Sequence, residues 1–213
     1  MGTRASLPPS VQGRRERRKH VTRRELLAAG RRLFAERGLY ESRIEDLSRR
    51  AGIAKGTLYG YFANKQELIE AVVRSGFHEL LERVQRAAQE ARTRPEAIER
   101  VTEAHLAFFR DNPDLMRVFH QVRGLLKFDR PGPRPLRRVL GRYLDGLAQV
   151  LALRRSGRRA AGVRDLDLAI LLFGTVSGVT SVHASVDGRA LTRIESRAAR
   201  RAIVRMVQSL DER

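Results

Sequence analysis

The sequence predicts an all-α fold of about nine helices. From Val21 onward, apolar residues recur at the spacing of a helical face almost without interruption. The alternation of apolar and polar residues that marks a half-buried strand never lasts more than a few residues. With 42% hydrophobic and 31% charged residues among 213, the chain has enough apolar side chains to form a core. Residues 1–20 are rich in cations without periodicity, and we expect them to form a disordered basic arm.

The first two helices are predicted from their end signals. One begins near Thr22 and ends at Gly38, at the position where a left-handed backbone usually terminates a helix. The next begins at Ser42, with Glu45 placed three residues later as in a capping box, and Gly52 interrupts it after about two turns.

A third short helix is predicted at about residues 55–61, directly after the turn at Gly52. Two short helices joined by a tight turn have the geometry of a helix-turn-helix, here at about residues 43–62. Its apolar residues would hold the two helices together and leave a polar and aromatic outer surface that suits the major groove of DNA. That surface consists of Lys55, Gly56, Thr57, Tyr59, Gly60 and Tyr61.

Longer helices are predicted for the rest of the chain. Asn64 and Glu67 cap a helix that continues to about Ala91, roughly 40 Å at 1.5 Å per residue and long enough to join two domains. The sequence Asn112–Pro113 supplies an N-cap followed by a first helical residue. The remaining helices are expected at about 95–111, 113–122, 136–154, 165–186 and 193–210.

The charge of the chain favours a polyanionic partner. It has 43 Lys and Arg against 24 Asp and Glu, a net charge of +19. Residues 1–66 carry 16 of those cations and only 6 of the acids, so the first third has the higher charge density. Only four of the cations are lysine, and a coding bias toward arginine is an alternative cause of the excess.

The helix-turn-helix resembles that of a known family. The strings Ala51-Gly52-Ile53 and Lys55-Gly56-Thr57-Leu58-Tyr59-Gly60-Tyr61-Phe62, followed by Asn64-Lys65, are similar to the N-terminal domain of the TetR family of bacterial transcriptional regulators. The resemblance covers about residues 21–75, while residues 76–213 fit the family's helical regulatory domain by architecture alone.

The resemblance implies a homodimer that binds a palindromic operator in double-stranded DNA and leaves it when a small-molecule effector binds the C-terminal domain, most often as a repressor. Besides the outer surface above, Lys65 matches a phosphate contact at a helix N-terminus. Arg43 stands where a small hydroxyl residue is usual and either contacts DNA or points into solvent. Ala54 replaces a frequent capping serine. Tyr59 and Tyr61, taken without the flanking pattern, could equally be half-buried aromatics. The basic arm either is solvated or enters a minor groove.

The C-terminal domain, residues 76–213, offers candidates for two further surfaces. Ligand-binding candidates are the aromatic and polar residues Phe77, His105, Phe109, Phe119, His120, Arg123, Phe128, Tyr143 and Phe173, most of which could also be plain core. In the family the last two helices usually form the dimer interface. Here that interface would use Phe173, Gly174, Ser177, Gly178, Ser181, Ile203 and Val207, with burial in the subunit's own core as the alternative.

Several classes of function are not expected. The chain has no cysteine, and its five histidines lack metal-ligand spacing, so we expect no metal, no cofactor and no catalytic residue. The apolar stretch from Leu168 to Val182 is short and rich in small residues, so we expect no membrane span and a protein of the bacterial cytoplasm, on the nucleoid when bound to DNA. A basic DNA-coating protein without an operator remains the alternative function.

Overall fold

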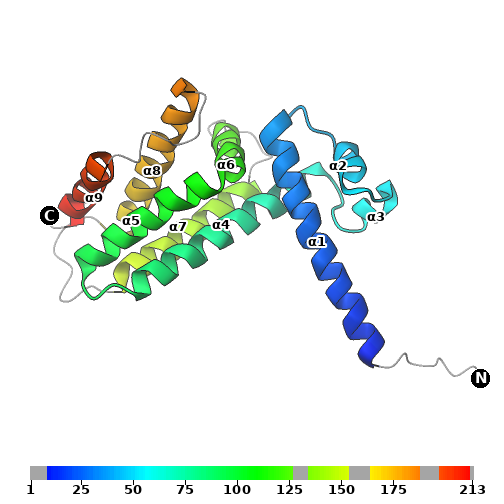
Figure 1. The fold of residues 1–213 in the computed structure, drawn as a ribbon, viewed down its shortest axis with the longest axis horizontal. Coiled ribbons are helices and arrows are strands. Elements are labelled where there is room, and N and C mark those ends of the chain that lie inside the picture. Colours follow the sequence, from blue (N-terminus) through cyan, green and yellow to red (C-terminus); the bar gives the residue numbers. More distant parts are fainter. Residues whose placement is uncertain (1–8, 127–133, 154–163, 188–196, 212–213) are drawn as a thin grey trace, which may run out of the picture. The chain divides into compact units, whose positions relative to one another are not determined.

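The structure of the chain is a computed structural model, which describes residues 9–126, 134–153, 164–187 and 197–211. The described residues form nine α-helices and no strand, which confirms the predicted all-α class (Figure 1). The helices are α1 (Pro9–Arg37), α2 (Ile44–Ala51), α3 (Lys55–Tyr59), α4 (Lys65–Gln89), α5 (Arg94–Asp111), α6 (Pro113–Leu126), α7 (Arg134–Ala152), α8 (Asp165–Asp187) and α9 (Arg197–Asp211).

The first helix is longer than the sequence predicted. It begins at Pro9 rather than near Thr22, so residues 9–20, which we expected to be disordered, continue the helix (Figure 1). Arginine, glutamate and glutamine are good helix formers, and proline is tolerated in a first helical turn. This segment has no apolar periodicity, but it extends α1, whose buried residues lie from Leu26 onward.

Helix ends in the first third of the chain are set by glycines in the left-handed region and by a side-chain cap. Gly38 and Gly52 adopt φ angles of +87° and +65°, which confirms that both glycines terminate helices in the left-handed region. The Asn64 side chain accepts the Glu67 N–H at 2.9 Å, and the Glu67 carboxylate accepts the Ala63 N–H at 2.8 Å, which confirms the cap of α4.

Ser42 does not cap α2 as predicted. Its hydroxyl donates inward to the Gly38 carbonyl at 2.6 Å, and Ser42 is buried. Arg43 occupies the N-cap position instead, and its backbone N–H donates to the Asp46 carboxylate at 3.1 Å. Since a guanidinium has no acceptor, the side chain of Arg43 cannot complete a capping box. The serine is used to fix the loop after Gly38 rather than the helix start.

The chain divides into two compact units between Val72 and Val73, whereas the sequence analysis placed the boundary after residue 75. Both positions fall inside α4. In the first unit, α2 packs against α1 and α3 around a core of fully buried side chains. Gly30 of α1 lets the first turns of α4 approach closely, because a Cβ there would lie 3.3 Å from both Leu68 and Val72. The core of this unit includes Leu26, Leu33, Phe34, Leu47, Leu58, Phe62 and Leu68.

The second unit is a helical bundle built around α8, which contacts α5, α6, α7 and α9. Arg94 at the start of α5 donates to the Asp165 carboxylate at the start of α8, 3.2 Å away, and also to the Leu151 carbonyl of α7. A Cβ at Gly76 of α4 would lie within 3 Å of side chains on α6, so this glycine fixes a close helix crossing. The crossing at Gly76 places the C-terminal part of α4 against α6 within the bundle.

Helix α8 contains one stretch that is apolar enough to cross a membrane. Among the described residues, Asp165–Val182 is the stretch that meets this criterion, with a mean hydropathy of 1.5 and a third of its length buried. Its contacts with four other helices are those of a core helix in a bundle. The part of α8 that remains exposed is described below with the candidate dimer surface.

Candidate nucleic-acid interface

The turn between α2 and α3 sets the direction of α3. Gly52 has φ +65° and ψ +30°, and its N–H donates to the Arg49 carbonyl, so the chain reverses within a few residues. Leu47 of α2 and Leu58 of α3 are fully buried and hold the two helices together. One face of α3 is thereby fixed in the core while the other faces solvent.

The solvent face of α3 carries most of the residues predicted from the sequence. Lys55, Gly56, Thr57, Tyr59 and Gly60 are exposed, while Tyr61 is half-buried beside Phe62 at a ring-centroid distance of 6.5 Å. Helix α3 has no side-chain cap at Ala54, as the sequence predicted. The structure therefore assembles five of the six predicted residues on one accessible surface.

Two of these side chains contact the carboxylate of Glu45, which the sequence predicted to complete a capping box with Ser42 instead. Glu45 of α2 forms an ion pair with Lys55, with 2.8 Å between Nζ and Oε1. The Tyr59 hydroxyl donates to the same Oε1 at 3.4 Å, and the Lys55 ammonium lies 5.9 Å from the centre of the Tyr59 ring. The hydrogen bond between Lys55 and Glu45 raises the pKa of the lysine and lowers the pKa of the glutamate. Sequence periodicity carries no signal for such a contact between two helices.

Lys65 and Arg43 lie on either side of this surface in the sequence and differ in their surroundings. Lys65 is half-buried and its ammonium donates to the Tyr40 carbonyl at 2.9 Å; burial lowers its pKa. The remaining two ammonium protons are available to a further acceptor. The side chain of Arg43 is exposed at the start of α2. Tyr40 itself is 77% exposed and was not among the sequence candidates.

The ligand-binding candidates of the second unit form a packed aromatic cluster. The Phe77 ring stacks on Phe119 at 4.2 Å and on Tyr143 at 4.7 Å, and Phe173 lies 5.3 Å from Tyr143. All four are buried, as is Phe109, whose ring lies edge-on to Phe119. Since the rings fill one another's space, a ligand among them would have to displace at least one ring.

His105 is the buried polar member of this cluster. Its Nδ1 lies 3.0 Å from the Val101 carbonyl, which can only accept, so Nδ1 carries the proton and Nε2 accepts from the Tyr143 hydroxyl. Burial lowers the pKa of His105 to about 4 and raises that of Tyr143 well above its usual value. Both side chains are therefore neutral at physiological pH.

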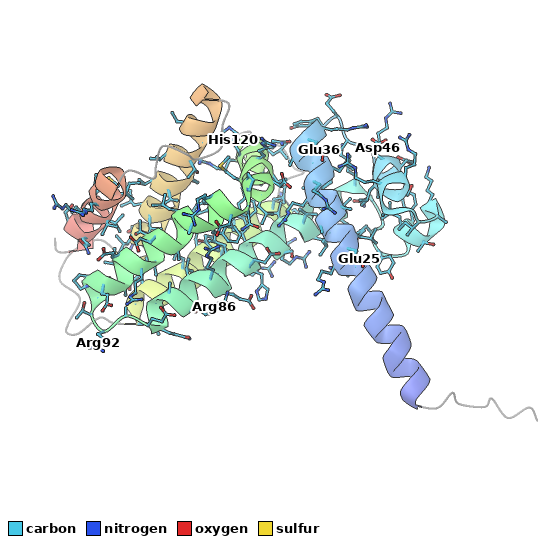
Figure 2. The ribbon with its side chains drawn as sticks, in the orientation of Figure 1. Glu25, Glu36, Asp46, Arg86, Arg92 and His120 are labelled. Atoms are coloured by element: carbon cyan, nitrogen blue, oxygen red, sulfur yellow. The ribbon has the colours of Figure 1, made fainter. Side chains whose placement is uncertain are left out.

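The other ligand candidates do not join the cluster. His120 is exposed on α6, and its Nδ1 lies 2.8 Å from the Ser181 hydroxyl of α8 (Figure 2). Arg123 donates to the Ser177 hydroxyl of α8 at 3.0 Å. These two residues connect α6 with α8 at the edge of the bundle. Phe128 lies outside the described residues.

The predicted dimer residues fall on two different faces. Phe173, Ile203 and Val207 are buried within the subunit, the alternative that the sequence analysis left open. Gly174 is exposed and the other three are half-exposed. Four large apolar residues of the same two helices are also exposed, and they were not among the sequence candidates. These are Ile170, Leu171 and Val182 of α8 and Met206 of α9.

A five-residue helix with an exposed cationic and aromatic face, set by a glycine turn on a second short helix, defines a helix-turn-helix DNA-binding protein. Among the described residues no group of three or more histidines and acids is placed to hold a metal ion. Residues 26–72 match the family described as bacterial regulatory proteins, tetR family.

Curated relatives agree with this match. The fatty acid metabolism regulator protein of Bacillus subtilis (strain 168) is 23% identical over 168 residues, which are 76% of this chain and 84% of that protein. The HTH-type transcriptional repressor KstR2 of Mycobacterium tuberculosis (strain H37Rv) is 42% identical over 52 residues, 24% of this chain and 26% of that protein. These relatives are transcriptional regulators rather than enzymes.

Solved structures share the fold along most of the chain. The regulator FadR from Bacillus subtilis, solved with stearoyl-CoA, has a TM-score of 0.71 at 20% identity and covers 85% of this chain and 95% of its own. AibR, solved with isovaleryl coenzyme A and operator DNA, has a TM-score of 0.61 at 16% identity, with 89% and 98% covered. The match assigns residues 26–72 to the tetR family of DNA-binding regulators, and the solved structures show that the rest of the chain shares the fold of such regulators.

Proposed function

We propose that the protein is a repressor that binds a palindromic operator as a homodimer and leaves it when a small-molecule effector binds the second unit. The observation that carries the proposal is the exposed face of α3, where Lys55, Thr57 and Tyr59 present donors and an aromatic ring. Gly56 and Gly60 beside them carry no side chain that would hold DNA away. When bound to DNA, the protein would lie on the nucleoid.

Phosphate contacts would come from cations at the edges of this face. Lys65 has two ammonium protons beyond the one given to Tyr40, and the exposed side chain of Arg43 begins α2. Contacts to phosphates fix the register of a recognition helix on DNA, while contacts to base edges supply the specificity.

Two copies of the chain are needed because one five-residue helix reads few bases. The exposed apolar face formed by α8 and α9 offers a surface for the second copy. On α8, Ile170, Gly174 and Gly178 are four residues apart and share one side of the helix, where the glycines permit close approach of a partner helix. Pairing about a two-fold axis matches a palindromic operator.

The test is selection of fragmented genomic DNA by the purified protein at about 200 mM salt, followed by sequencing, since non-specific binding weakens strongly at that salt. Recovery of a few sites that share an inverted repeat is the expected result. Even enrichment across the genome would contradict the proposal and favour a DNA-coating protein. A Lys55→Ala/Thr57→Ala variant should lose the selected sites while its thermal unfolding stays unchanged.

For the effector we propose an acyl-CoA. Two structural neighbours were solved with stearoyl-CoA and isovaleryl coenzyme A, and the aromatic cluster around Phe77 gives the second unit an apolar region that an acyl chain could enter by displacing rings. The Tyr143 hydroxyl could donate to a thioester carbonyl if it left His105 Nε2, because it is the only donor of this neutral pair that is not held by a backbone carbonyl. The measurement is release of labelled operator DNA during titration with acyl-CoAs of increasing chain length. Free coenzyme A is the control, and equal release by it would contradict the role of the acyl chain.

A further inference from the structure

Glu45 contacts both side chains of α3 that are best suited to reach a base edge. Its Oε1 is 2.8 Å from the Lys55 ammonium and 3.4 Å from the Tyr59 hydroxyl. The ammonium also lies 5.9 Å from the Tyr59 ring centre, at the outer limit of a cation–π contact. The three side chains therefore form a closed triangle on the surface that the protein would present to DNA.

Local helix stabilisation does not account for this direction of the Glu45 side chain. A carboxylate in the first turn of α2 is favoured by the helix dipole wherever it points. Asp46, the next residue, already serves the local structure: it accepts the Arg43 N–H and pairs with Arg37 at 3.4 Å and with Arg49 (Figure 2). Glu45 instead reaches across to α3, where its only described partners besides its own helix are Lys55 and Tyr59.

An acidic group at a DNA-binding surface reduces affinity for phosphates, so its presence requires a compensating role. Paired with Glu45, Lys55 contributes little net charge, and the ion pair favours one direction of its side chain. An ammonium has three protons, so Lys55 can donate to a base edge without leaving Glu45. A contact with a phosphate would gain less, because the Glu45 carboxylate 2.8 Å away offsets the charge of the lysine and repels the phosphate.

We propose that Glu45 is a positioning residue for sequence specificity, which orients Lys55 and Tyr59 toward base edges and withholds the Lys55 charge from non-specific phosphate contacts. This inference rests on the proposed function, because it requires an operator. It differs from that function in assigning discrimination between sequences to a residue of α2 that carries a negative charge.

The test compares wild type with Glu45→Gln on the selected operator and on a random duplex of equal length. Freed of its partner, Lys55 can neutralise one more phosphate. Binding to random DNA should therefore tighten several-fold, and its salt dependence should steepen by about 0.9 in the slope of log affinity against log salt. Operator binding should gain less or weaken, so the ratio of the two affinities should fall about five-fold or more.

Glu36→Gln is the matched control. Glu36 pairs with Arg50 at 2.6 Å on the surface of the same unit, so this variant removes the same charge without involving α3. Its affinity ratio should stay within two-fold of wild type. In a Lys55→Met background, Glu45→Gln should leave the slope unchanged, since the charge that it would free is gone. Because this comparison is made within one background, it also holds if the single variant alters stability.

Three results would overturn the inference. These are an unchanged ratio in Glu45→Gln, an equal change of the ratio in Glu36→Gln, and persistence of the change in slope in the Lys55→Met background. Each presupposes that the wild-type protein has selected an operator. A wild type that enriches no site overturns the proposed function itself, so the two failures are distinguishable.

Discussion

His105 shows how one buried residue links the stability of the protein to pH. In the folded chain it is fully buried, and burial lowers its pKa to about 4, compared with about 6.5 in an unfolded chain. Between these values the unfolded state binds a proton that the folded state excludes. The folded state therefore loses stability as the pH falls below about 6.5, and this loss levels off near pH 4.

We predict that lowering the pH from 7 to 5 costs about 2 kcal/mol of unfolding free energy through His105 alone. Urea unfolding of wild type and His105→Gln at both pH values measures this, because the variant should lack that part of the pH dependence whatever its absolute stability. Tyr143→Phe is the control: it alters the same cluster but keeps the imidazole, so its pH dependence should persist. Equal slopes in wild type and His105→Gln would contradict the prediction.

At the scale of elements, the turn between α2 and α3 requires a glycine for its backbone conformation and not for lack of room for a side chain. A Cβ at Gly52 would meet no atom within 4 Å, but its φ of +65° is unfavourable for any other residue except asparagine or aspartate. Gly56 likewise has open space around its Cα but lies within helix α3. Gly52 is therefore required for the fold of the turn, whereas Gly56 is available for close approach to DNA.

We predict that Gly52→Ala destabilises the protein by about 1 kcal/mol, while Gly56→Ala leaves stability unchanged or raises it, because alanine is the better helix former. Gly56→Ala should nevertheless weaken operator binding, since its methyl group would stand between α3 and the DNA. Thermal unfolding and operator titration of both variants test this. If Gly56→Ala bound the operator like wild type, close approach at this position would be excluded.

The sequence predicted the helix ends that depend on nearby residues, but it did not predict the contacts between helices. Gly38, Gly52 and the pair Asn64–Glu67 set helix ends through residues only a few positions apart, and the structure confirms them. Ser42 failed as a cap because its hydroxyl found a partner in the preceding loop. The sequence identified residues 168–182 as apolar but did not indicate which side of α8 other helices would cover, because that depends on how α5, α6, α7 and α9 pack.

For the whole molecule, the uncovered side of α8 is the feature that a single chain leaves unexplained. Ile170 is 46% and Val182 61% exposed on a helix whose other side is buried by four neighbours. Large exposed apolar residues that gather on one helix face mark an interaction surface. In the proposed homodimer this face meets its own copy, and the two α3 helices then bind one operator together.

We predict that Ile170→Arg converts the dimer to a monomer with little effect on the stability of the single chain, because the residue is exposed there. Two charges brought face to face by two-fold symmetry would repel each other in an apolar interface. Operator affinity should fall about 100-fold or more, since each half-site must then be bound separately. Leu153→Arg, which places the same charge on a 62% exposed leucine after α7, is the matched control and should remain dimeric. Light scattering gives the mass of each variant, and a dimeric Ile170→Arg protein would move the interface away from this face of α8.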